Sequence, residues 1–313
     1  MSKIVVCGIT QIETIVKVPK IPVQYEAFTP AKDSIFTAAG GDAFNISLAM
    51  SWLGDDVDFM TVVGKGQDLG MFNPPDRSVT LSTEYVLPVM NETPMQVTFF
   101  DKDRLHQKFE DLKDIREAQY DLSLVEKVVP NSDLVFLSNV NFARPFIRIA
   151  QASRKPLAVK IHSFSREKEV YNEDFLKAAE ILYFSDGTRT EDPYEFIKEM
   201  AQKYGTQIIL LGQSSEGVIL YERRRDITVH YDPVSAGQVV NTAGAGNAQF
   251  ACFLHYYLKN GDSKEAMHKA LLFTANKIGY MGTSNGFMTE EQLEQWEGLI
   301  FDPNDVVSRF GAK

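Results

Sequence analysis

The chain has 313 residues, 44% of them hydrophobic and 24% charged, which is the usual composition of a soluble globular protein. A formal net charge of −10 argues against a nucleic-acid partner or an anionic membrane surface, while leaving room for a local basic pocket that binds a phosphorylated ligand. The sequence has no run of about 18 apolar residues, so we expect no membrane-spanning helix.

The cysteines and histidines predict neither disulfide nor zinc chemistry. Cys7 and Cys252 lie in apolar segments, so we expect buried free thiols, as the reducing cytoplasm allows. The five histidines are scattered, with no second histidine or cysteine at ligand spacing, and we predict no zinc site. The apolar run within Met1–Gly8 is too short for a signal peptide, so we expect a cytoplasmic protein.

The first half of the chain alternates short apolar, β-branched runs with stretches of helical period. Strands are expected at residues 3–8, 34–38, 58–64, 133–137 and 156–161, and part of 9–18 also alternates. Helices are expected from about residue 42 to Leu53, where Gly54 follows, and over 122–129. Two strand-like runs at 83–89 and 96–100, separated by Met90–Pro94, predict a hairpin.

The second half continues the alternation. Strands are expected at 181–184, 207–211 and 217–221, and helices around 175–179 and over 193–204, 250–258, 263–281 and 289–299. Alternating strands and helices predict a mostly parallel sheet covered on both faces. We therefore expect one α/β domain over residues 1–313, with a small β lid formed by segments of about 9–36 and 83–104 that break the alternation.

A turn of small residues follows the segment Gln238–Val240. Ala243, Gly244, Ala245 and Gly246 have almost no side chains, so their backbone N–H groups can approach a ligand closely. A helix begins at this turn, and helix N-termini carry partial positive charge, which together predict an anion site, most plausibly for phosphate. The alternative is a tight strand-to-helix turn in which the glycines serve only packing.

Four motifs in one order show a family resemblance. They are Gly8–Glu13 on the first strand, Gly40-Gly41-Asp42-Ala43-Phe44-Asn45 with Leu53-Gly54, the turn Gly64–Gly70, and the late segment Asn241–Phe250. With these motifs the chain resembles the ribokinase-like, or PfkB, family of sugar kinases over essentially its whole length. The resemblance implies a three-layer αβα fold with a β lid, and fold alone does not fix function.

The resemblance places Glu13, Gly41, Asp42 and Asn45 at the sugar substrate. Carboxylates and amides suit hydroxyl-rich ligands because they can bind hydroxyl groups in pairs. For Asp42 and Asn45 the alternative is helix N-capping, and for Glu13 it is a solvated strand face. Lid residues would choose the sugar, and the candidates are Thr93, Gln96, Thr98 and Arg104.

The same resemblance predicts the nucleotide side of the site. Ala243, Gly244, Ala245 and Gly246 would form the anion hole for the transferring phosphoryl group. The residues expected at the nucleotide are Gly212, Gly217, Gly244, Gly246 and Asn276. For Asn276 the alternative is an ordinary surface position on a helix.

The late motif departs from the family at its central residue. Asn247 stands where the family has the Asp that accepts the proton of the attacking hydroxyl, and an amide cannot be a general base. Either another acid serves, or the residue was introduced to trap a complex. Asn241 likewise replaces an Asp beside the family's monovalent-cation site, which puts activation by that cation in doubt.

Two further departures lie on the ligand side. Ser185-Asp186-Gly187-Thr188 stands where an Asn-x-x-Glu motif for magnesium and phosphate is expected, so we identify no metal ligand. Lys160 and His162 replace polar residues of a middle strand. They would recognise an acidic or phosphorylated group, or else are simply ion-paired or exposed.

The resemblance implies an ATP- and Mg²⁺-dependent kinase that transfers the γ-phosphoryl group to a hydroxyl of a sugar or sugar derivative. Its partners would be that sugar, the nucleotide and a second copy of the chain paired through the lid. The alternative is a catalytically degenerate protein that binds a sugar or nucleotide. A dinucleotide-dependent oxidoreductase ranks far lower, since the glycine motif lacks its third glycine and does not follow the first strand.

Overall fold

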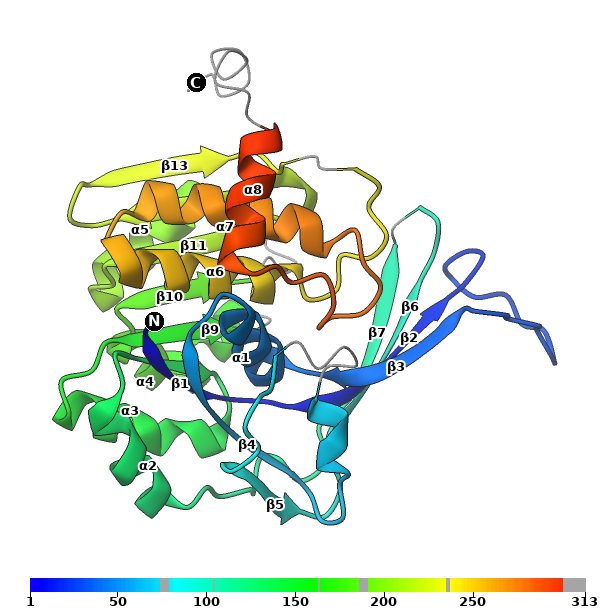
Figure 1. The fold of residues 1–313 in the computed structure, drawn as a ribbon, viewed down its shortest axis with the longest axis horizontal. Coiled ribbons are helices and arrows are strands. Elements are labelled where there is room, and N and C mark those ends of the chain that lie inside the picture. Colours follow the sequence, from blue (N-terminus) through cyan, green and yellow to red (C-terminus); the bar gives the residue numbers. More distant parts are fainter. Residues whose placement is uncertain (74–78, 104, 163, 186–190, 235–236, 301–313) are drawn as a thin grey trace.

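The structure is a computed structural model that describes residues 1–73, 79–103, 105–162, 164–185, 191–234 and 237–300 (Figure 1). Its centre is a sheet of nine strands in the order β13-β12-β11-β10-β9-β8-β1-β4-β5. The strands are β1 (Lys3–Cys7), β4 (Asp56–Gly64), β5 (Val86–Met90), β8 (Leu134–Ser138), β9 (Leu157–Ile161), β10 (Ile181–Phe184), β11 (Ile208–Gly212), β12 (Val218–Glu222) and β13 (Ile227–Tyr231). All neighbours pair in parallel except β11 with β12 and β12 with β13, which confirms the mostly parallel sheet.

Helices cover both faces of this sheet. They are α1 (Asp42–Trp52), α2 (Leu122–Val128), α3 (Arg144–Ala152), α4 (Glu169–Ala178), α5 (Pro193–Tyr204), α6 (Ala245–Asn260), α7 (Ser263–Lys277) and α8 (Glu290–Ile300). Short 3₁₀ turns lie at Leu69–Phe72, Val129–Asn131, Asn141–Ala143, Arg166–Lys168 and Ser214–Glu216. None of the helices in the described ranges is both long and apolar enough to cross a lipid bilayer.

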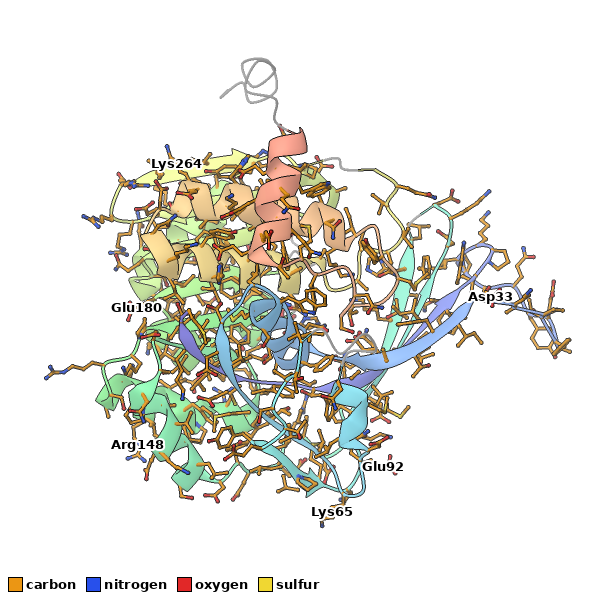
Figure 2. The ribbon with its side chains drawn as sticks, in the orientation of Figure 1. Asp33, Lys65, Glu92, Arg148, Glu180 and Lys264 are labelled. Atoms are coloured by element: carbon orange, nitrogen blue, oxygen red, sulfur yellow. The ribbon has the colours of Figure 1, made fainter. Side chains whose placement is uncertain are left out.

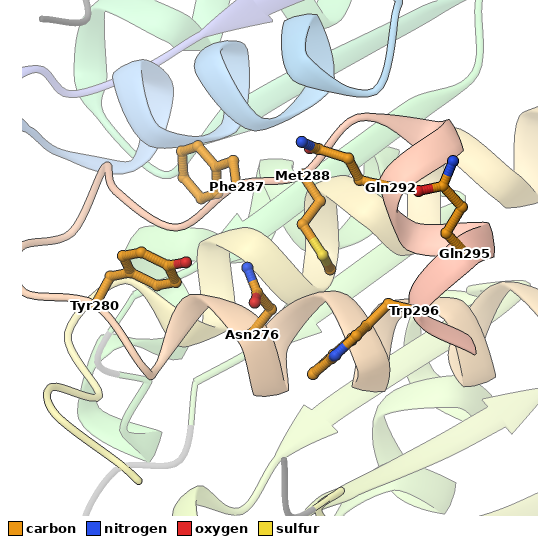
Figure 3. A pocket seen from close by; sticks show the side chains of 7 residues that line it. All are labelled: Asn276, Tyr280, Phe287, Met288, Gln292, Gln295 and Trp296. Carbon is orange, nitrogen blue, oxygen red and sulfur yellow. The ribbon is translucent and has the colours of Figure 1, made fainter. Parts of the chain in front are cut away.

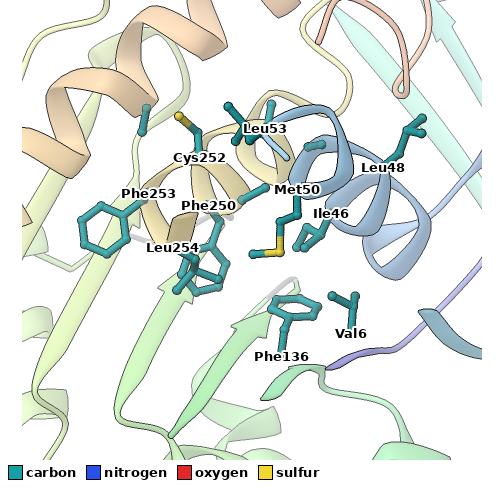
Figure 4. Close-up of a cluster of buried hydrophobic side chains, with 14 of the residues drawn as sticks. Val6, Ile46, Leu48, Met50, Leu53, Phe136, Phe250, Cys252, Phe253 and Leu254 are labelled. Carbon is teal, nitrogen blue, oxygen red and sulfur yellow. The ribbon is translucent and has the colours of Figure 1, made fainter. Parts of the chain in front are cut away.

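Two apolar layers follow from the alternation of side chains along each strand. On β1, Ile4 and Val6 pack in one cluster with α1, α6 and α7, whereas Val5 and Cys7 pack in the other with helices α2 to α5. Figure 4 shows the first cluster, in which Phe250 of α6 lies over Phe136 of β8. Charged residues such as Arg148, Glu180 and Lys264 are exposed at the periphery (Figure 2).

A second sheet of four strands, the lid sheet, projects from one end of the large sheet (Figure 1). It has the order β3-β2-β6-β7, with β2 (Gln11–Lys17), β3 (Ile35–Gly40), β6 (Met95–Phe100) and β7 (His106–Asp111). Strand β2 pairs antiparallel with β3 and parallel with β6, and β6 pairs antiparallel with β7. The chain thus forms two sheets, as the sequence predicts, but the second extends to residue 111.

The hairpin predicted from residues 83–89 and 96–100 is wrong. Strand β5 pairs in parallel with β4 of the large sheet, and β6 joins the lid sheet. Residues 91–94 therefore carry the chain from one sheet to the other, where Gly64 N donates to Thr93 Oγ1 at 2.9 Å. The two runs have the same local β pattern, which does not say with which strand each pairs.

Three elements have no counterpart among the sequence predictions, namely β7, β13 and helix α3. Strand β7 is exposed along its whole length and polar except for Phe109, so it has no alternating apolar signal. Strand β13 pairs with β12 after the charged turn 223–226, and its residues are only half-buried, so its apolar signal is weak. Helix α3 begins with Arg144-Pro145, and proline is favoured at a helix start. Phe146, Ile147, Ile149 and Ala150 form its buried face.

Candidate active site

Helix α1 begins where β3 leaves the lid sheet. Gly41 has a φ of 93°, and a Cβ there would lie 2.6 Å from the Ile9 carbonyl oxygen, so this turn requires glycine. Gly41 is the N-cap, and no side chain caps the helix. Asp42 and Asn45 therefore do not act as N-caps, and both side chains are buried instead.

Asp42, Lys160 and Asn247 form a buried polar cluster, the central cluster. Lys160 Nζ, from β9, donates to Asp42 Oδ1 at 2.7 Å and also donates to Asn247 Oδ1. Burial by itself raises the pKa of Asp42, but the charges of Lys160 and His162 and hydrogen bonds from Lys160 and Asn247 outweigh it, so the pKa is lowered. The cluster thus holds an ionised carboxylate beside Asn247, the residue that the sequence analysis predicts at the position of the base.

The turn before α6 presents free backbone donors. Gly244 is the N-cap with a φ of 81°, and α6 runs for 16 residues behind it. Ala243 N donates to Asn241 Oδ1 at 2.9 Å. Within the described ranges the N–H groups of Gly244 and Gly246 have no acceptor. Two free N–H groups at a helix N-terminus suit an oxyanion, and Asn247 lies one position beyond them.

Both glycines of this turn are closely packed. A Cβ on Gly244 would lie 2.4 Å from the Thr283 carbonyl oxygen, and one on Gly246 would lie 2.9 Å from Tyr183 Oη. Tyr183 also crowds Gly212 at the end of β11, where a Cβ would lie 2.6 Å from the same oxygen. The ring of Tyr183 therefore brings the predicted nucleotide residues Gly212 and Gly246 together.

Glu13 is buried on the lid sheet and not solvated. Its Oε1 accepts hydrogen bonds from Gly41 N at 2.9 Å and from Gln11 Nε2 at 2.9 Å. Gln11 Nε2 also lies 3.3 Å from Gln96 Oε1, and Gln96 Nε2 donates to Thr98 Oγ1 at 3.1 Å. The predicted substrate residues Glu13 and Gly41 are thus in contact, and a polar network joins them to the lid residues.

Asn276 lies on a pocket between α7 and α8. The pocket has a volume of about 300 Å³ and is lined by Asn276, Tyr280, Phe287, Met288, Gln292, Gln295 and Trp296 (Figure 3). Asn276 Nδ2 donates to the Gly286 carbonyl at 3.0 Å, which fixes the amide at the pocket wall. Aromatic rings beside amide groups suit a flat heteroaromatic base.

The structure accounts differently for the other predicted residues. A Cβ on Gly217 would lie 2.1 Å from the Tyr231 carbonyl oxygen, so strand packing alone requires glycine there. The side chain of His162 is exposed, and its backbone N–H donates to Asn139 Oδ1 at 3.1 Å. Arg104 and residues 186–188 of the expected metal motif lie outside the described residues. Among the described residues, no group of three or more His, Cys, Asp or Glu side chains could hold a metal.

Sequence reasoning also missed the fully buried Lys277. Lys277 ends α7 with no exposed surface, and its Nζ donates to the Gly282 carbonyl at 2.6 Å. Burial lowers the pKa of the Lys277 ammonium to about 7, and the charge of Glu13 opposes that shift. The only sequence signal is a lysine on the side of α7 that also carries Phe273 and Ala270.

Sequence comparisons with known proteins match the second half of the chain to a kinase family. A family model described as pfkB family carbohydrate kinase matches residues 176–290. The deoxyribokinase of Salmonella typhi is 32% identical over 111 residues, which make up 34% of this chain and 35% of that enzyme. The chain thus matches only about a third of that relative's length.

Two solved structures share the fold over nearly the whole chain. The microbiome-derived acarbose kinase Mak1 has a TM-score of 0.78 at 22% identity and covers 94% of this chain and 98% of its own. The Arabidopsis thaliana ribokinase complexed with ribose and ATP has a TM-score of 0.71 at 17% identity, with coverage of 94% and 98%. These likenesses confirm the predicted fold: a large, mostly parallel sheet flanked by helices, with a second small sheet.

Proposed function

We propose that the chain is a carbohydrate kinase of the ribokinase-like PfkB family and that it transfers the γ-phosphoryl group of ATP to a hydroxyl of a sugar or sugar derivative. The observation that carries the proposal is the central cluster, in which Lys160 joins an ionised Asp42 to Asn247, the residue that follows Gly246 at the start of α6. Phosphoryl transfer relies mainly on positioning and electrostatics, which this arrangement supplies.

We assign the proton of the attacking hydroxyl to Asp42. Asn247 cannot accept it, because its amide oxygen already accepts a hydrogen bond from Lys160 and is not basic. The lowered pKa of Asp42 keeps its carboxylate ionised at neutral pH, and Lys160 holds it in place. The carboxylate that other family members carry in the late motif is thus supplied from α1.

The turn before α6 would hold the phosphoryl oxygens. Gly244 and Gly246 N–H groups are free to donate to them, and Asn247 can position the acceptor hydroxyl. ATP supplies the phosphoryl group, and we propose that Mg²⁺ arrives on its phosphates. We place the base in the pocket beside Asn276 and Trp296 and take Gly212 as the wall nearest the phosphates.

Glu13, Gly41 and Asn45 would bind the sugar hydroxyls. In the part of the chain that the structure describes, Glu13 Oε2 and Asn45 Oδ1 are buried and have no hydrogen-bond partner, which suits groups that bind donors of a ligand. The chain has two buried free thiols, Cys7 and Cys252, so we propose that it works in the cytoplasm.

The test is steady-state ADP release with full-length chain, ATP, Mg²⁺ and a panel of sugars. We expect turnover above background with at least one sugar, and we expect Asp42→Asn to lower kcat by about 10²–10⁴-fold while sugar binding persists. Asn247→Ala should cost much less. Equal losses of kcat in Asp42→Asn and Asn247→Ala would contradict the assignment of Asp42 as the proton acceptor.

A second candidate is a sugar- or nucleotide-binding protein without catalysis. Asn247 favours it, because the residue keeps the shape of a catalytic Asp without its charge. Absence of turnover with every sugar, together with calorimetric binding of one and gain of turnover in Asn247→Asp, would establish this candidate instead.

A further inference from the structure

The inner face of the lid sheet carries a row of polar side chains from three neighbouring strands. Glu13 of β2 pairs with Gln96 of β6, and Gln96 pairs with Glu110 of β7. Directly paired residues point to the same face of a sheet. Glu13 accepts from Gly41 N, so this face is turned toward Asp42 at the start of α1.

The spacing of the row matches a small ligand. Neighbouring strands lie about 4.8 Å apart, so the backbones carrying Glu13 and Glu110 are separated by roughly 10 Å, with Gln96 between them. A single sugar ring with one substituent is of that size. The two carboxylates therefore bracket the proposed sugar site, one buried and one at its open side.

Three buried atoms near this row have no hydrogen-bond partner among the described residues. They are Glu13 Oε2, Gln11 Oε1 and Asn45 Oδ1, in side chains exposed by only 5%, 4% and 1%. All three are acceptors, and a buried acceptor without a donor is costly. The site is therefore suited to a ligand with several hydrogen-bond donors.

The charges of the row indicate which kind of hydrogen-bond donor the ligand carries. In the described part of the chain neither Glu13 nor Glu110 has an ion-pair partner, whereas Asp42 is paired with Lys160. Burial and the negative charges of Asp42 and Glu13 raise the pKa of Glu110, with Lys108 and Lys168 opposing them. A bound neutral sugar would remove water from these carboxylates and supply no charge in return.

Other cations near the row do not neutralise it. Lys108 pairs with Thr98 in the next row and is exposed, and Lys168 lies on a 3₁₀ turn of the large domain. Lys277 donates to the Gly282 carbonyl. None of the three forms an ion pair with Glu13 or Glu110 among the described residues.

We propose that the acceptor substrate is an amine-bearing sugar, whose protonated nitrogen lies between Glu13 and Glu110 above Gln96. The inference rests on the proposed function, since it names the substrate class of the same site. An ammonium group supplies both the missing positive charge and several N–H donors for the unpartnered acceptors.

The test compares matched sugars by isothermal titration calorimetry of the full chain without nucleotide. The probes are 1-amino-1-deoxyfructose, glucosamine and galactosamine, each with its N-acetyl derivative and its hydroxyl parent. Acetylation removes the charge and keeps the sugar. We expect at least one free amine to bind about 10- to 100-fold more tightly than its acetylated and hydroxyl counterparts, the range of a charge-assisted hydrogen bond.

Two variants test whether the row causes the tighter binding of the free amine. Glu110→Gln keeps the shape of the side chain and should reduce the preference toward unity, whereas Glu117→Gln, an exposed glutamate outside the row, should leave it unchanged. The inference is overturned if no amino sugar binds, if neutral partners bind equally well, or if Glu110→Gln keeps the preference.

Kinase activity is measured in a separate experiment. ADP release is measured with each sugar that binds. A preference for the free amine without ADP release would overturn the proposed kinase activity and leave the inference on substrate class standing. Phosphorylation of neutral sugars alone would overturn the inference on substrate class and leave the kinase activity standing.

Discussion

Lys160 and Asp42, 118 positions apart in the chain, form a buried ion pair of 2.7 Å between Nζ and Oδ1. The pair joins the end of β9 to the first residue of α1, with side-chain exposures of 5% and 8%. Loss of one partner of such a pair leaves an uncompensated buried charge. The pair is therefore expected to matter for both folding and catalysis.

Lys160→Met is expected to destabilise the chain by about 3–5 kcal/mol at pH 7, because Asp42 stays buried without its cation. Urea unfolding measures the loss. The folded-state pKa of Asp42 is lowered, so its ionisation contributes stability that is present above the unfolded pKa and lost as pH falls through the folded pKa. The difference between wild type and Lys160→Met should accordingly shrink in acid.

The controls separate the pair from a general effect of losing a lysine. Lys198→Met removes an exposed lysine and should change stability by less than about 0.5 kcal/mol. The double variant Asp42→Asn/Lys160→Met should be more stable than Lys160→Met alone, since no buried charge remains. If the double variant is less stable than Lys160→Met, the unpaired charge of Asp42 does not cause the loss of stability.

Gly246→Ala is expected to weaken ATP binding about tenfold or more, because the new Cβ would lie 2.9 Å from Tyr183 Oη and displace the turn that we propose as the phosphate site. Calorimetry with ATP measures the loss. Gly298→Ala, where a Cβ meets nothing within 4 Å, is the matched control. Restored affinity in Gly246→Ala/Tyr183→Phe would assign the effect to that contact, and unchanged ATP affinity in Gly246→Ala would refute it.

The sequence predicted the parts of this site that depend on local chain geometry. The turn before α6 and the helix start at Gly41 require small residues at fixed positions, so the residues themselves reveal them. Asn247 likewise stood out, because its motif fixes its place on α6. Most strands and helices were predicted within a few residues, since apolar period is also a local property.

The sequence could not reveal contacts between distant segments. The sequence allows Lys160 to be either ion-paired or at the ligand, and only the fold shows that its partners are Asp42 and Asn247. The sequence does not single out Glu110, because its strand is polar except for Phe109 and its row depends on the pairing of β6 with β7. The wrong hairpin at 83–100 has the same cause, since pairing partners are not a local property.

Lys277→Met is expected to flatten the pH dependence of stability between about pH 7 and 10. The folded-state pKa of Lys277 is lowered to about 7, so the unfolded chain binds more protons at alkaline pH and the free energy of unfolding rises with pH over this range. Methionine does not titrate and removes that rise. Urea unfolding at pH 7 and pH 9 measures the slope, and Lys264→Met, at an exposed site, should keep it. An equal slope in wild type and Lys277→Met would show that the amine titrates normally.

Phe109→Asp is expected to convert a lid-paired homodimer into monomers. The outer face of the lid sheet carries exposed apolar side chains. Cross-strand pairing places Phe109 beside Val97, and Met95 and Ile35 lie on the same face. Ile35, Met95 and Phe109 are 64%, 43% and 56% exposed. Exposed apolar patches on a sheet mark association surfaces, and a two-fold dimer uses the same patch on both copies. Light scattering coupled to size exclusion should give a dimer mass for wild type and for Tyr194→Asp, whose residue is exposed on α5 away from the lid, and a monomer mass for Phe109→Asp. A monomeric wild type at all concentrations tested, or dimers that persist in Phe109→Asp, would exclude this interface.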